Sequence, residues 1–384
     1  MKFNKKIELI LLSIFTASGT TLSSWLFVIA PEINAFFLEN FNTKDVIYDI
    51  IGWGNLGFAI TCFPIGLLLT RYQKYQKYFL VGCFLSAFFG VFILICPNYE
   101  YVKLSRFILG FGIAILITTG FTFVRNNLSE EEIKQFIPLN SLLNYVIMIT
   151  GLFFTYFVSK VYILLPFLIY LIFGIALFFV KSIKPTQIQE KSSSDLKNYK
   201  LNLIALSTTY SVIFCICIAM FFIFLNISSA EIFAKKDLFL FTMIDVLFSA
   251  LVSILYKKIK FFKREYHNIS INFIILGLTI LGIFICSEIN VYYIAILIAI
   301  YAICKTTILI QASIWYIMLS SKKNIGILSS IFSISMFMGF YMATIIDKNL
   351  IENVISKQIL LGMTLIFIGM IIFLTSFFDR KRLY

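Results

Sequence analysis

The sequence predicts an all-α polytopic membrane protein, with twelve transmembrane helices in two pseudo-symmetric bundles of six. Three observations support this prediction. Hydrophobic residues make up 60% of the 384 positions, charged residues make up 13%, and the mean hydropathy is +0.95, whereas soluble domains carry about 25% charged residues. Twelve apolar runs are long enough to cross a bilayer, and the basic residues gather in alternate loops between them.

The apolar runs set the number of spans. A bilayer core of roughly 30 Å requires about 20 helical residues, because unpaired backbone groups cannot be left in hydrocarbon. The runs that meet this length lie at 7–29, 46–69, 78–96, 103–124, 135–158, 161–180, 201–226, 237–256, 268–287, 291–319, 326–346 and 358–378. The first run could instead be a signal peptide, but it is longer than the ~7–15 apolar residues of such a peptide, and Pro31 follows the candidate cleavage site.

The loop charges test the twelve-span prediction independently. If the N-terminus is cytoplasmic, 23 of the 32 Lys and Arg residues lie in cytoplasmic segments and 7 lie in outer segments, as expected from the retention of basic residues inside. Both termini are therefore predicted to be cytoplasmic, in a cell membrane of the bacterial inner-membrane type. The net charge of +13 is then explained by topology and by attraction to anionic lipid, without a nucleic-acid partner.

A polar segment divides the chain near its middle. Residues 181–200, "KSIKPTQIQEKSSSDLKNYK", have the Ser- and Lys-rich composition of a cytoplasmic linker. The predicted domains are a six-helix bundle over 1–180, this linker, and a second six-helix bundle over 201–384. The segments that begin at Leu128 and Leu319 align loosely, and two similar halves of the same orientation are typical of transporters built from parallel repeats.

The fourth span carries a charged residue followed by spaced glycines. Its segment "RFILGFGIA", with Arg106, Gly110 and Gly112, resembles the fourth-helix motif of the major facilitator superfamily. Glycines at this spacing let a neighbouring helix approach closely, and a charge within the bilayer is usually kept for function. The alternative is that Arg106, three residues after Lys103, extends to the outer headgroups.

A second resemblance lies between spans two and three. In "GLLLTRYQKYQK", Gly66, Arg71 and Lys74 fit the short cytoplasmic loop motif of that superfamily, whereas Thr70 stands where the family has Asp. The family's loop helps to latch the two halves through that carboxylate, so the departure puts the latch in question. A purely topogenic role for Arg71 is the alternative. The resemblance implies alternating access around a cavity lined by spans one, four, seven and ten.

Three ionisable residues are predicted to lie inside spans, namely Arg106, Asp245 and Lys305. In the superfamily's fold, spans eight and ten are placed so that Asp245 and Lys305 could face each other. The pair would then be a site at which a proton or a substrate competes with the contact between Asp245 and Lys305. The alternative is a static, structural ion pair. An unpaired ammonium at the middle of a span is costly, so Lys305 needs a carboxylate or an anionic substrate.

Uncharged polar residues add to these candidates. Gln311 and Trp315 follow Lys305 on roughly one helical face, and Asn144 in span five and Tyr210 in span seven belong to polar clusters on spans near the expected cavity. A charge, an amide and an aromatic wall suit a small polar or anionic organic solute.

Enzyme chemistry has little support in the sequence. His267 is the only histidine and is placed in a cytoplasmic loop, and the seven cysteines show neither a zinc spacing nor a disulfide framework. We therefore expect no cofactor and no metal, and a monomeric secondary transporter; the titratable Asp245 favours coupling to protons. Efflux of drug-like or siderophore-like compounds is an alternative; a membrane-embedded enzyme, a scramblase or a transporter-like receptor are remote ones.

Overall fold

The computed structural model describes most of the chain as helix. The described residues are 10, 12–16, 24–43, 46–72, 74–180, 213, 235–256, 265–286, 291–319, 325–349 and 354–378. The helices are η1 (Ser24–Ile29), α2 (Ala30–Phe41), α3 (Val46–Arg71), α4 (Tyr75–Ile95), α5 (Tyr99–Asn127), α6 (Glu130–Val158), η2 (Leu165–Tyr170), α7 (Leu171–Leu177), α9 (Lys235–Leu255), α10 (Glu265–Cys286), α11 (Val291–Leu319), α12 (Ile325–Asn349) and α13 (Val354–Phe378). Within these ranges the structure contains no strand.

Nine of the twelve predicted spans each coincide with one described α-helix, and a tenth, 161–180, contains η2 and α7. Within the described residues, α3, α4, α5, α6, α9 and α11 are long and apolar enough to cross a membrane, and shorter apolar segments lie in η2–α7, α10, α12 and α13. The predicted span 201–226, apart from residue 213, lies outside the described residues, as does the predicted linker 181–200.

Two local predictions were wrong. The predicted sixth span, 161–180, is not one continuous α-helix but contains the 3₁₀-helix η2 and a short α-helix, α7; Pro166 near the start of η2 has no backbone N–H to donate. The predicted first span ends at residue 29, where η1 ends, and the separate helix α2 follows with Pro31 in its first turn, where proline is well tolerated. His267 lies in the first turn of α10 and not in a loop.

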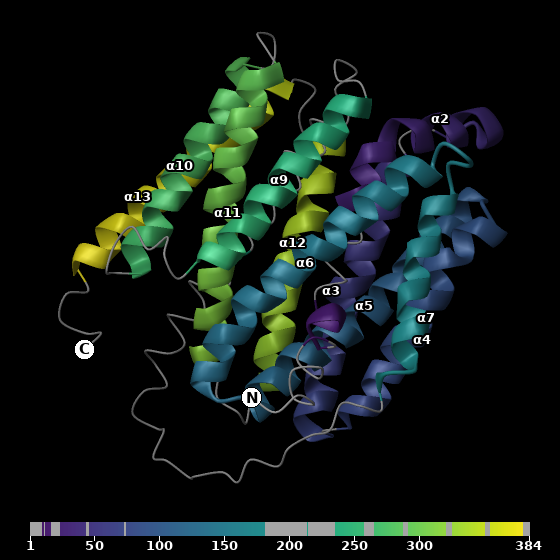
Figure 1. Cartoon of the computed structure of the whole chain (residues 1–384), viewed down its shortest axis with the longest axis horizontal. Helices are drawn as coiled ribbons and strands as arrows, with labels where there is room; N and C mark the ends of the chain where they lie inside the picture. The colour runs from purple at the N-terminus through teal and green to yellow at the C-terminus, as the bar shows by residue number, and fades with distance from the viewer. Residues whose placement is uncertain are drawn as a thin grey trace.

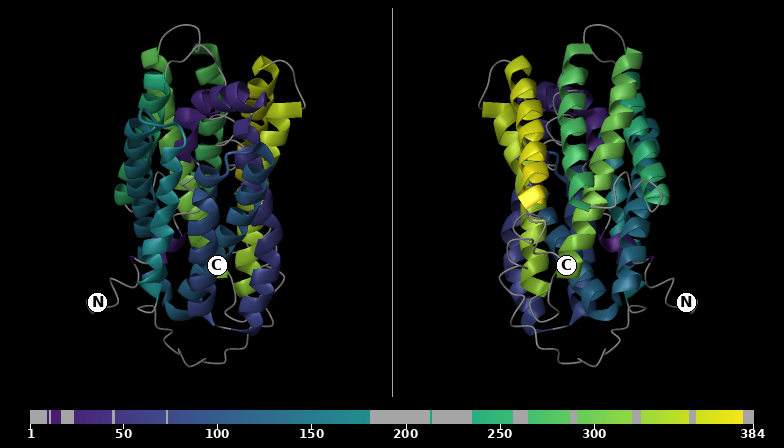
Figure 2. Two further views of the ribbon diagram at one scale, coloured as in Figure 1. Left: turned by 90° about the vertical axis from the view of Figure 1, so that its right-hand side faces the viewer. Right: turned by 90° about the vertical axis from the view of Figure 1, so that its left-hand side faces the viewer.

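The two halves of the chain lie side by side, and their long helices run in roughly the same direction, whereas α2 lies crosswise to them (Figures 1 and 2). The helices α2 to α7 form the N-terminal half, and α9 to α13 form the C-terminal half. Each half has its own helix packing, α3 with α5 and α4 with α5 in the first, α10 with α13 and α10 with α11 in the second. The halves meet where α12 packs on α3 and α9 packs on α6.

Glycines set how closely α5 approaches its neighbours. A Cβ added at Gly110 would overlap the backbone of α3 at Gly54 and Phe58, and a Cβ at Gly112 would lie 2.5 Å from the Oγ of Ser86 on α4. Helices pack this tightly only where side chains are absent from the contact. Arg106, one turn before Gly110, is therefore held in a closely packed part of the N-terminal half.

Candidate functional site

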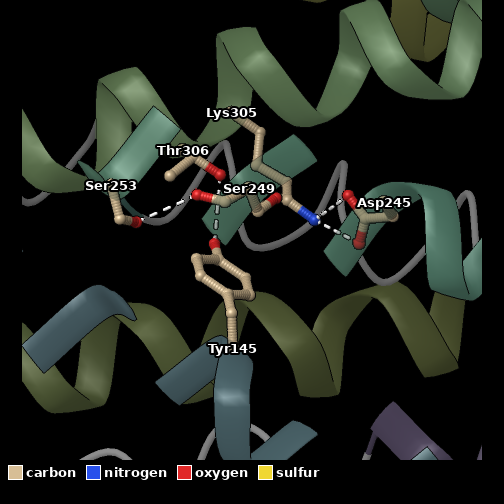
Figure 3. Close-up of polar contacts among 6 residues, drawn as sticks. All are labelled: Tyr145, Asp245, Ser249, Ser253, Lys305 and Thr306. Carbon is tan, nitrogen blue, oxygen red and sulfur yellow. Dashed lines mark hydrogen bonds and ion pairs between the residues drawn. The ribbon is translucent and has the colours of Figure 1, made fainter. Parts of the chain in front are cut away.

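The two ionisable residues of the C-terminal half form a buried ion pair. Lys305 of α11 lies with its Nζ 2.5 Å from both Oδ1 and Oδ2 of Asp245 on α9 (Figure 3). Lys305 is 2% exposed and Asp245 is 1% exposed. Losing one member of a buried pair typically costs roughly 3–5 kcal/mol, because the other charge is left uncompensated. Each residue therefore stabilises the charged form of the other.

Serine side chains on the same helix as Asp245 lead toward the N-terminal half. On α9, Ser253 donates a hydrogen bond of 2.9 Å to the carbonyl oxygen of Ser249, which lies one turn after Asp245. The Oγ of Ser253 also lies 2.9 Å from the Oγ of Ser141 on α6. These contacts place the ion pair beside the boundary between the halves.

A second polar contact crosses the same boundary next to Lys305. The hydroxyl of Tyr145 on α6 lies 3.1 Å from the Oγ1 of Thr306 on α11, and Figure 3 shows the Tyr145 side chain pointing toward it. The ring of Tyr301, one turn before Lys305, has its centroid 5.0 Å from Nζ, close enough for a cation–π attraction. A relative motion of the two halves would break the hydroxyl contacts near the pair.

Four other residues were predicted to line the cavity, and the structure describes the side chains of only two of them, Gln311 and Asn144. Gln311 is buried and accepts a hydrogen bond from the hydroxyl of Tyr256 at the end of α9. Asn144 is half-buried on α6 beside Tyr145. The side chain of Trp315 and the whole of Tyr210 lie outside the described residues. The structure thus joins Lys305 to Asp245 and Gln311 to Tyr256.

Arg106 occupies a separate, buried position in the N-terminal half. It is 2% exposed, and its guanidinium carbon lies 4.4 Å from the ring centroid of Phe167 and 5.1 Å from that of Tyr170. Its Nη2 is 3.4 Å from the carbonyl oxygen of Gly90 on α4. Two aromatic rings from η2 cover the charge, which argues against the alternative that Arg106 extends to the headgroups.

The loop motif between α3 and α4 begins inside α3 at Gly66, and this first residue contacts the C-terminal half. A Cβ at Gly66 would meet the backbone of Gly326 on α12. Thr70, at the position of the family's Asp, donates its hydroxyl to the carbonyl oxygen of Gly66 within α3. Arg71 and Lys74 are exposed, and Arg71 lies 5.3 Å from the ring of Tyr72.

Sequence reasoning did not single out Ser249, Ser253 or Tyr256, which lie on or directly after the same helix as Asp245. The two serines follow Asp245 at intervals of four residues, a spacing that places side chains on one helical face. That regular spacing could have revealed a polar stripe on span eight. No comparable sequence signal pairs Tyr256 with Gln311, because the two residues belong to different helices.

The long apolar helices, with a few buried charges inside each half, define a multi-pass membrane protein. A family model described as "Major Facilitator Superfamily" matches residues 9–344. The chain therefore belongs to the major facilitator superfamily, and the resemblance inferred from its motifs is confirmed. A comparison with curated protein sequences finds no match.

Two solved structures are similar over nearly the whole chain. The human organic anion transporter MFSD10 (TETRAN) aligns with a TM-score of 0.72 at 10% identity, covering 97% of this chain and 99% of that chain. A variant of the E. coli fucose:proton symporter FucP aligns with a TM-score of 0.65 at 14% identity, covering 97% of this chain and 99% of that chain. At these identities the similarity shows the fold, and it confirms the predicted architecture of two six-helix bundles.

Proposed function

We propose that this protein moves a small polar or anionic organic solute across the membrane by alternating access, with protons as the coupling ion. The observation that carries the proposal is the contact between Asp245 and Lys305, which are buried together in the C-terminal half, next to the residue Thr306 that contacts the N-terminal half. In soluble interiors a buried pair is often structural, but ionisable groups within membrane spans usually mark substrate or proton pathways.

The chemistry of the pair suggests how coupling would work. A proton that binds Asp245 neutralises the carboxylate, so Lys305 loses its counter-charge. The ammonium then favours an anionic group of the solute as its new partner. Release of the proton restores the ion pair and displaces the solute. Proton and solute thus each stabilise one of the two partners, which links their binding.

The contacts between the halves support a cycle of opening and closing. Helix α6 contacts the C-terminal half through Tyr145 near its middle and through Ser141 one turn earlier, which meets Ser253. Further along α6, Tyr156 packs on Phe239 of α9 with ring centroids 4.6 Å apart. Access to the buried pair from either side of the membrane requires some of these contacts to separate. A solute that binds only when they are closed would shift the population toward that state.

The names of the similar structures are consistent with this solute class. One is described as an organic anion transporter and the other as a fucose:proton symporter. For this chain we propose an anionic or polar organic solute, proton coupling, a monomer, cytoplasmic termini and a bacterial inner-membrane location.

Reconstitution into proteoliposomes tests the proposal. Amino acids, carboxylates, sugars and metallophores are first screened by the thermal stabilisation of the purified protein, and any ligand is then used in uptake assays with an imposed pH gradient. We expect gradient-driven accumulation in the wild type and none in Asp245→Asn. Accumulation by Asp245→Asn equal to that of the wild type would remove the pair from the coupling mechanism.

A further inference from the structure

A small cavity lies beside Arg106, apart from the ion pair. It has a volume of about 30 Å³ and is bounded by α3, α5, η1, η2 and α12; the residues that matter here are Asn55, Phe58, Arg106, Tyr170 and Phe337. One ordered water needs about 10–15 Å³, so the cavity has room for two waters or one small ion.

The polar groups at this cavity include donors that lack a partner. Arg106 offers five N–H groups; its Nη2 reaches the carbonyl oxygen of Gly90, but its Nε has no hydrogen-bond partner among the described residues. The Nδ2 of Asn55 likewise has none within the described part of the chain. Asn55 is 4% exposed and Arg106 is 2% exposed. Buried donors of this kind are rare unless a ligand or water satisfies them.

Within the described ranges the structure shows no carboxylate paired with Arg106, whereas Lys305 has Asp245. Phe167 and Tyr170 stabilise the guanidinium through their ring faces, and the Tyr170 hydroxyl also accepts a hydrogen bond from Arg106, but Nε itself has no partner among the described residues. An anion in the cavity would supply both a negative charge and an acceptor for Nε.

We propose that this cavity binds a small monovalent anion, held by the Nε of Arg106 and the Nδ2 of Asn55. The anion is either the carboxylate group of the transported solute or a free inorganic ion such as chloride. A planar guanidinium suits an oxygen anion because its N–H groups form a fixed fork, and an adjacent amide adds a neutral donor without adding a second charge.

The other half of the protein contributes one wall of the cavity. Phe337 of α12 stacks on Phe58 of α3 with ring centroids 3.4 Å apart, and both residues line the cavity. Separation of α12 from α3 at this level would remove one wall, so a bound anion favours the closed arrangement. The inference deepens the proposed function, and it rests on that function only where the anion is taken to be part of the solute.

Thermal unfolding of the purified full-length protein tests this site. The protein is placed in a chloride-free sulfate buffer and titrated separately with sodium formate and sodium chloride. In the wild type we expect a saturable rise in Tm with at least one of the two anions. In Asn55→Ala the half-saturating concentration should rise by about tenfold or more, as expected when one donor to a charged acceptor is lost.

A second substitution of Asn55 should change the Tm of the anion-free protein in a way that a simple loss of the amide would not. Asn55→Asp places a carboxylate in the cavity with almost no change in volume, so it should raise the Tm of the anion-free protein and remove the response to added anion. Arg106→Gln should also remove the response. If that variant does not fold, the two Asn55 variants still decide the question. The matched control is Asn272→Ala, which removes a buried amide of α10 that bonds within its own helix and should keep the response.

The formate titration, the chloride titration and the control variant together decide whether the site binds an anion and of which kind. A response to formate alone supports the site and assigns it to a carboxylate, and a response to chloride supports the site and admits an inorganic ion. No saturable response to either anion, or an unchanged response in Asn55→Ala, would overturn the inference. Asp245→Asn should keep the anion response even if it loses uptake, so failure of the proposed function is distinguishable from failure of this site.

Discussion

Gly66 of α3 and Gly326 of α12 meet backbone to backbone, so that a Cβ placed on either residue would lie 2.5 Å from the carbonyl oxygen of the other. Close by, the Oγ1 of Thr122 on α5 lies 2.9 Å from the Oγ of Ser329 on α12. The two halves therefore touch here with only small side chains, such as those of Ser330 and Thr70, around the contact, and a methyl group at this contact must push them apart.

Gly66→Ala and Gly326→Ala should each open this end of the molecule and reduce transport, because the added Cβ cannot be accommodated without a backbone shift. The measurement is the rate at which a thiol reagent modifies Thr122→Cys in a cysteine-free background, which should rise in both variants. Gly174→Ala is the matched control, since its Cβ would meet only the Cβ of Ala87 at 3.8 Å. Equal rates in the Gly66→Ala and control proteins would contradict this account.

Removal of one member of the buried ion pair should destabilise the protein. We expect Asp245→Asn or Lys305→Gln to lower the free energy of unfolding by roughly 3–5 kcal/mol, the range for a buried charge that loses its partner. The double variant should recover much of this stability yet show no gradient-driven accumulation, because a neutral pair can pack but cannot exchange a proton. Thermal melts and proteoliposome uptake together provide the check. A double variant that accumulates solute like the wild type would leave the pair as a structural bridge.

Ligand binding separates the role of Lys305 from that of Asp245. If Lys305 binds the solute's anionic group directly, Lys305→Ala should abolish ligand-induced stabilisation while Asp245→Asn retains it. Titration calorimetry with the ligand found in the thermal screen measures the difference. Equal loss of affinity in both variants would mean that the intact pair, and not Lys305 alone, maintains the binding site.

Arg106→Lys should insert into the membrane normally and transport poorly. The substitution keeps the charge but loses the planar set of donors that reaches Gly90 and the cavity. Protein abundance in isolated membranes and initial uptake rates provide the test. Full activity of Arg106→Ala would show that this position has no role in transport.

The twelve-span topology predicts that Lys235 and Lys257 lie on opposite sides of the membrane, outside and inside respectively. Cysteines at these positions should differ in labelling by an impermeant thiol reagent applied to intact cells. Permeabilised cells, in which both positions become accessible, are the control. Equal labelling in intact cells would disprove the twelve-span arrangement.

The sequence by itself determined the spans and the class of fold. Hydropathy over about 20 residues is a local property, since each helix satisfies its own backbone hydrogen bonds, and nine predicted spans accordingly coincide each with one described α-helix. The glycine spacing after Arg106 and the loop at Gly66 indicated the superfamily, which the family comparison confirmed. The break of the sixth span into η2 and α7 was not predicted, because apolar composition is the same for a continuous and an interrupted helix.

Only the tertiary structure decided which polar groups meet. Asp245 and Lys305 belong to different helices, and the sequence suggested their contact only through the superfamily's arrangement of spans. It gave no indication that Arg106 would lie under Phe167 and Tyr170 or share a cavity with Asn55. The physical reason is that such contacts depend on the rotation of each helix about its axis. In helices that are apolar on nearly every face, hydropathy does not fix that rotation, and it is set by close packing at glycines and by the pairing of the few buried charges.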